Sequence, residues 1–136
     1  MDDTAAPPGT RRFQGTYPAE PAQVSHARRA LTQALHGHPA ADDATLVASE
    51  LATNAILHSA SGNGGKFTLR AEIRHGHIRI EVEDAGGPWR RGRHADGRAH
   101  GLDVTEILTG PGNWGITGDD TGRTAWALIP TPPPGN

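Results

Sequence analysis

Two neighbouring segments in the middle of the chain alternate between apolar and polar residues. Every second position is apolar in residues 66–74, and the same alternation continues through residues 78–83. This pattern is typical of β-strands with one buried face, and the short connection around Gly76 predicts an antiparallel hairpin. Because only one face of the hairpin is apolar, we expect helices to cover that face alone and to form a two-layer α/β (α+β) sandwich.

Apolar residues at helical spacing predict two helices before the hairpin. In residues 22–36 alanine, valine and leucine recur at intervals of three and four, and Gly37 ends the pattern. A second helix is expected over residues 42–58, with Asp42 or Asp43 as its N-cap. These two helices are the natural cover for the apolar face of the hairpin.

The rest of the chain contains shorter signals and long polar segments. We expect a short edge strand at Phe13–Tyr17 and a closing strand at residues 124–129. Between the hairpin and the closing strand lie a polar segment at residues 84–100, a helix at about 102–108 and a glycine-rich segment at 110–122. A polar loop as long as the first of these is usually functional or disordered in a compact domain.

The 136 residues fit a single domain. No repeat or internal linker interrupts residues 11–130, so we expect one domain there. Residues 1–10 are expected to be a disordered leader and residues 131–136 a disordered proline-rich tail. Hydrophobic residues make up 35% of the chain, which is low for a compact domain and agrees with ends that add little to the core.

Charge and composition exclude several classes of function. The net charge of −2 gives no overall basic footprint for nucleic acid, and the absence of cysteine excludes disulfides, thiolate metal sites and cysteine nucleophiles. No signal-peptide pattern and no apolar run near the length of a membrane span is found. We therefore expect a cytoplasmic protein that contacts neither membrane nor nucleic acid directly. A Walker A loop is also excluded, because no Gly-Lys-Ser/Thr sequence occurs.

Polar residues border the apolar side of the predicted second helix. Glu50, Asn54 and His58 are four residues apart and form one stripe beside Leu51 and Ala55. One interpretation is a partly exposed helix flank whose polar groups bond to their neighbours. The other is a cation site, because an asparagine carbonyl oxygen suits Mg²⁺ and a nearby glutamate can orient or deprotonate a nucleophile.

Two glycine-bearing segments have the chemistry to contact a ligand. Asp84 ends a predicted strand just before Gly86, so its carboxylate can accept a hydrogen bond while the glycine lets a flat ring approach the backbone. An ordinary Asx turn also accounts for these residues. The segment around Gly101 precedes a predicted helix, where backbone amides bind anions and Arg98 can add a contact to phosphate.

Taken in order, these segments resemble the motifs of the GHKL ATPases, the class that includes gyrase, MutL, histidine kinases and heat-shock chaperones. Residues 50–58 resemble the N box, residues 80–86 the G1 box and residues 99–102 the G2 box. The resemblance covers about residues 11–130. It implies a Bergerat-type ATP-binding fold, in which helices cover one face of a mixed, largely antiparallel sheet.

Further segments are similar to small bacterial anti-sigma-factor serine/threonine kinases. They are residues 47–55, the Trp114-Gly115 pair and residues 122–126. This resemblance implies a regulatory protein that moves the γ-phosphoryl of ATP to a Ser or Thr of an antagonist protein. It also implies possible sequestration of a sigma factor and a possible homodimer.

The resemblance implies a role for each matching residue. Glu50 would be the general base, and Asn54 would coordinate Mg²⁺ between the protein and the phosphates of ATP. Asp84 would accept the adenine amino group in a pocket shaped by Gly86, with Thr124 nearby. Residues expected to contact phosphate, at or just after a lid at residues 88–100, are Arg98, His100, Gly101 and Leu102.

Two residues depart from the motifs, and they leave alternatives open. Pro88 and Ala99 stand where the motifs have glycine. One alternative is a nucleotide-sensing interaction module with weak or no transfer activity. Another is a module that binds no nucleotide and whose motif residues serve the structure.

Overall fold

The computed structural model describes residues 11–58, 65–84, 105, 107–110, 112–119 and 122–131. The elements in chain order are β1 (Arg11–Pro18), α1 (Pro21–Ala34), α2 (Ala41–His58), β2 (Lys66–Arg74), β3 (His77–Asp84), β4 (Trp114–Asp119) and β5 (Gly122–Pro130). Residues 105 and 107–109 are also helical, in the region of the third predicted helix and one residue beyond its expected end. The expected leader, most of the expected tail and the expected lid lie outside the described residues.

The five strands form one open sheet in the order β1-β2-β3-β5-β4, and each neighbouring pair is antiparallel. The predicted hairpin is confirmed as β2 and β3, with Ala71 opposite Ile80 and a turn at Gly76, whose φ is +86°. Glycine adopts this φ at no steric cost. The strand expected at the N-terminus is confirmed as the edge strand β1, longer by a few residues than its pattern indicated.

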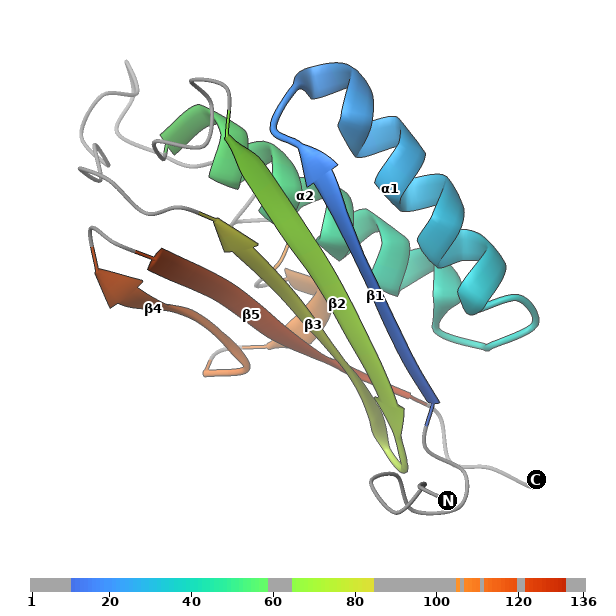
Figure 1. The fold of residues 1–136 in the computed structure, drawn as a ribbon. Helices are drawn as coiled ribbons and strands as arrows, with labels where there is room; N and C mark the ends of the chain where they lie inside the picture. The colour runs from blue at the N-terminus through green and yellow to red at the C-terminus, as the bar shows by residue number, and fades with distance from the viewer. Residues whose placement is uncertain are drawn as a thin grey trace, which may run out of the picture.

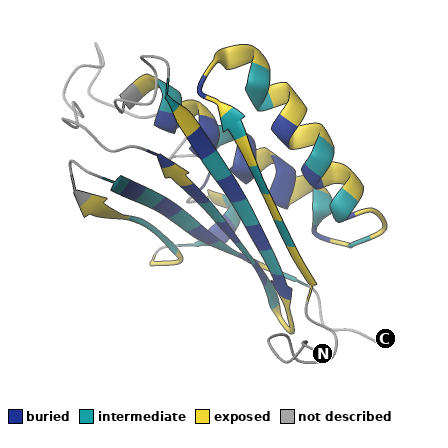
Figure 2. Cartoon of the chain, in the orientation of Figure 1, coloured by how far each residue is buried: buried dark blue, intermediate teal, exposed yellow. Residues whose placement is uncertain are grey.

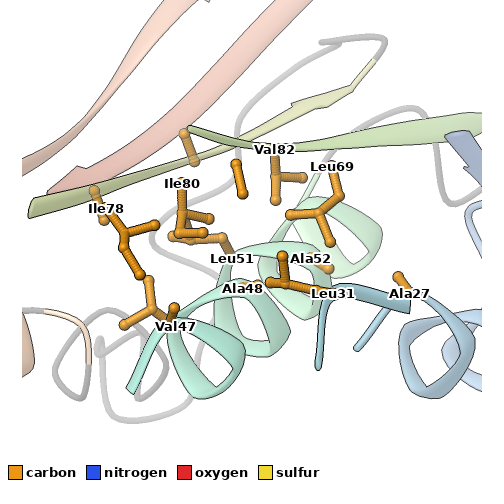
Figure 3. Packing of buried hydrophobic residues seen from close by; sticks show 14 of the residues in the cluster. Ala27, Leu31, Val47, Ala48, Leu51, Ala52, Leu69, Ile78, Ile80 and Val82 are labelled. Atoms are coloured by element: carbon orange, nitrogen blue, oxygen red, sulfur yellow. The ribbon is translucent and has the colours of Figure 1, made fainter. Parts of the chain in front are cut away.

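Both long helices lie on the same face of the sheet, which confirms the two-layer α+β sandwich (Figure 1). Burial alternates along the central strands, as the sequence pattern predicted (Figure 2). The core lies between the layers, where Val47 and Leu51 of α2 point toward Ile78 and Ile80 of β3 (Figure 3). No helix in the described part of the chain has the length and apolarity to cross a membrane.

The expected N-cap of the second helix is wrong. The helix begins at Ala41, so Asp42 and Asp43 lie inside its first turn, where acidic side chains interact favourably with the helix dipole. The backbone N–H of Ala40 instead donates a hydrogen bond of 3.0 Å to Nδ1 of His38. A histidine nitrogen therefore accepts the backbone N–H of the residue just before the helix begins.

Strand β4 was not predicted, because it lies in the glycine-rich segment. Trp114 and Ile116 pack against the core, while Gly115 between them faces the other side. There the indole of Trp126 covers the glycine, so closely that a Cβ on Gly115 would lie 3.0 Å from the ring. The glycine thus serves the packing of its neighbour on β5.

Candidate functional site

Glu50 and Asn54 lie on one flank of α2, at the border between its buried side and its exposed side. Successive side chains are rotated by about 100°, so Asn54 falls within about 20° of the buried Val47. Asn54 is buried, Glu50 is half-buried and Thr53 is exposed. The buried Ser49 lies on the opposite flank, so it does not share the side of the helix that carries the Glu50 carboxylate and the Asn54 amide.

Asn54 is a buried polar residue on the flank of α2, with 7% of its surface exposed. Buried amide groups are usually bonded to the protein, to water or to a ligand. The Asn54 carbonyl oxygen is a hard donor, so the residue fits a Mg²⁺ ion that takes its other ligands from phosphates and water.

Asp84 ends β3 on the inner face of the sheet. It is buried and in phase with Val82, whose side chain belongs to the core. Directly opposite in the β3–β5 register is Arg123, which is also buried. Residues opposite one another on antiparallel strands have Cβ atoms about 5 Å apart, so the two charged side chains leave the backbone at neighbouring positions of the inner face.

The sequence analysis missed Arg123. The signal was available, because Arg123 is in phase with Ala125 and Ala127, the apolar positions of the closing strand. A charged residue at an inward-facing position of a strand requires a partner, which marks it as a candidate site residue. Its position opposite Asp84 could be recognised only once the register was known.

Thr124 is not brought to the same face as Asp84. Its register partner is Glu83, and both lie on the outer face of the sheet, away from the helices. The sequence expectation placed Thr124 beside the adenine-binding aspartate. The structure brings its backbone to the neighbouring strand but directs its side chain to the other face.

The ends of α2 and β3 meet at one edge of the domain. Asn54 lies one turn before the end of α2, and Thr68, shortly after the start of β2, pairs with Glu83 at the end of β3 (Figure 1). This arrangement brings the amide of α2 and the carboxylate of Asp84 toward the same end of the sandwich. The expected site residues that lie outside the described residues are Gly86, Arg98, His100, Gly101 and Leu102.

Comparison with known proteins identifies the family of the chain. No curated protein sequence matches the chain. Residues 17–118, by contrast, match the histidine kinase-like ATPase domain, a region that runs from β1 into β4 and includes Glu50, Asn54 and Asp84. The chain therefore belongs to the family of histidine kinase-like ATPase domains, which are ATP-binding domains of the GHKL type.

Proposed function

We propose that this protein is an ATP-dependent serine/threonine protein kinase similar to the small bacterial anti-sigma-factor kinases. It would transfer the γ-phosphoryl of ATP to a Ser or Thr of an antagonist protein and sequester a sigma factor, acting in the cytoplasm as a homodimer. The main support is a pair of residues on α2, the half-buried Glu50 and, one turn later, the buried Asn54. The pair lies in a domain that belongs to a family of ATP-binding domains.

Each described site residue has a distinct task in this mechanism. Asn54 is the residue that would hold Mg²⁺, which when bound neutralises charge on the phosphates of ATP. The Asp84 carboxylate accepts a hydrogen bond from the adenine amino group. The carboxylate of Glu50 accepts the proton of the acceptor hydroxyl while that oxygen bonds to the γ-phosphorus and the bond to ADP breaks. Partial exposure leaves Glu50 within reach of a hydroxyl on another protein.

A second candidate is a nucleotide-sensing interaction module without transfer activity. Pro88 and Ala99, which stand at motif glycines, favour it. The two functions share the nucleotide site and differ only in the phosphoryl transfer step. Experiments that separate binding from transfer therefore distinguish them.

Calorimetry with Mg-ATP tests the nucleotide site. We expect the wild-type chain to bind, and Asn54→Ala and Asp84→Asn each to weaken binding about tenfold or more, because each loses one charged or polar contact to the ligand. Thr53→Ala is the matched control, because Thr53 is exposed on the same helix and should bind like wild type. Absence of heat with the wild-type chain would exclude both candidate functions.

Transfer of labelled phosphate to candidate antagonist proteins tests the kinase. Glu50→Gln should retain ATP binding and lower the transfer rate by about 100-fold or more, because the amide cannot accept the proton. Nucleotide binding without transfer by the wild-type chain would favour the sensing module. An unchanged rate in Glu50→Gln would show that Glu50 is not the base.

A further inference from the structure

The outer face of the sheet, opposite the helices, contains a hollow lined by arginines. Its volume is about 430 Å³, and it lies across β1, β2 and β3. Both helices of Figure 1 lie on the other face, so neither covers it. The charged residues that line it are Arg12, Arg70, Arg74, Arg79, Glu72 and Glu81.

Each carboxylate of the hollow is bound by two arginines. Glu72 accepts hydrogen bonds from Arg12 (3.3 Å) and Arg74 (2.8 Å), one on each oxygen. Glu81 similarly accepts from Arg70 (2.9 Å) and Arg79 (2.7 Å). Burial raises the pKa of the Glu81 carboxyl, but the hydrogen bonds and charges of the two arginines outweigh burial and hold that pKa below its usual value.

The arginines, by contrast, retain most of their hydrogen-bonding capacity. A guanidinium has five N–H groups. Within the described part of the chain Arg12, Arg74 and Arg79 each use one of them, and Arg70 uses two, the second toward Glu83. The side chains of Arg12 and Arg74 are 54% and 52% exposed, whereas that of Glu72 between them is 19% exposed. The surface therefore presents donors to solvent, with the carboxylates beneath them.

The charge and spacing of these donors indicate the kind of ligand. Four arginines against two glutamates give the hollow a net positive charge, although the whole chain carries −2. Arg70 and Arg74 are four residues apart on one strand, a separation of about 13 Å, which suits an extended chain better than a single small anion. The two glutamates repel any negative charge that comes close to them, so a chain whose negative charges are spaced apart is favoured over a continuous polyphosphate backbone.

An apolar surface adjoins the hollow on the next strand. The guanidinium of Arg79 lies over the ring of Trp126, 5.2 Å from its centroid, and the indole rests on Gly115. Arginine and tryptophan are the residue types that most often dominate protein–protein binding. The combination favours a protein ligand over a nucleic acid or an inorganic anion.

We propose that this face is a docking site for an acidic segment of a partner protein, whose carboxylates bind the free N–H groups of Arg12, Arg70, Arg74 and Arg79. The site goes beyond the proposed kinase activity and does not depend on it, because all of its residues lie on the face of the sheet opposite Asn54 and Asp84. If the docking site fails its test, the proposed nucleotide site is unaffected. If the nucleotide site fails its test, the docking site is unaffected.

Fluorescence anisotropy with a labelled octaglutamate peptide at low salt tests the proposal. The wild-type chain should bind this peptide and not octalysine, and affinity should fall as salt rises. Arg12→Gln/Arg74→Gln should weaken binding about tenfold, because two charge-assisted contacts are lost, and the Lys/Lys double variant should restore most of it. The control Arg28→Gln/Arg29→Gln removes the same charge from exposed positions of α1 and should bind like wild type.

Three results would overturn the proposal. They are failure of the folded wild-type chain to bind the peptide, equal weakening by the two glutamine double variants, and tighter binding of a single-stranded oligonucleotide than of octaglutamate. Sedimentation of each variant gives a fourth readout. A wild-type dimer that dissociates in Arg12→Gln/Arg74→Gln would show that a second copy of this chain occupies the face instead.

Discussion

At the scale of single residues, His38 makes the stability of the fold depend on pH. Its Nδ1 accepts the Ala40 N–H just before α2, which requires an unprotonated Nδ1. Partial burial lowers the pKa of His38, and the charge of Arg11 lowers it further. The unfolded chain therefore binds more protons than the folded chain between the two pKa values, and stability rises with pH across that window.

We predict that His38→Ala is destabilised relative to wild type by about 1 kcal/mol at pH 7.5, the usual net contribution of one hydrogen bond. The contribution of His38 should be complete above its unfolded pKa of about 6.5 and should disappear as pH falls through its lower folded pKa. Urea unfolding at several pH values measures this difference. His36→Ala, at an exposed position in the same loop, is the control. A difference in the free energy of unfolding between wild type and His38→Ala that stays constant with pH would contradict this account.

At the scale of elements, the pairing of β4 with β5 depends on Gly118, near the end of β4. Its φ is +109°, and an added Cβ would collide with the carbonyl oxygen of Gly122. Gly112 also has a positive φ, +83°, but open space surrounds its Cβ position. A comparison of substitutions at the two glycines therefore separates the cost of backbone strain from the cost of a steric collision.

We predict that Gly118→Ala lowers the free energy of unfolding by about 3 kcal/mol, whereas Gly112→Ala lowers it by about 1 kcal/mol. The difference arises because the first substitution must also displace the backbone of β5. Chemical denaturation of both variants provides the measurement. Equal losses would mean that the backbone of β5 moves away from residue 118 without cost.

The sequence was sufficient wherever one side-chain period dominates an element. The hairpin and the two long helices could be predicted because apolar residues mark one face of each. Strand β4 could not, because Gly115 lies against the ring of Trp126 and Gly118 lies close to the backbone of β5, contacts that only the three-dimensional structure reveals. The pairing of Asp84 with Arg123 was hidden for a similar reason, since register between distant strands leaves no local trace.

At the scale of the whole molecule, the two faces of the sheet contribute differently to folding stability. The inner face packs against the helices through fully buried aliphatic side chains, whereas the outer face carries partly exposed ion pairs. Exposed pairs contribute about 0–1 kcal/mol each, while a buried leucine contributes several times more. Folding stability therefore comes mainly from the contacts between the layers. Residues of the outer face and of the border of α2 contribute little to it, so they can be selected for binding a partner or a ligand.

Two leucines of α2 test this division. Leu51 is 0% exposed and faces β3, whereas Leu46 on the same helix is 42% exposed. We predict a loss of about 2–5 kcal/mol for Leu51→Ala, because it opens a cavity between the layers, and a loss under about 1 kcal/mol for Leu46→Ala. Both substitutions remove the same atoms from the same helix, so propensity effects cancel and urea unfolding reports packing alone. Similar losses in the two variants would mean that α2 is not seated on the sheet by this face, and the placement of Asn54 on its border would fail with it.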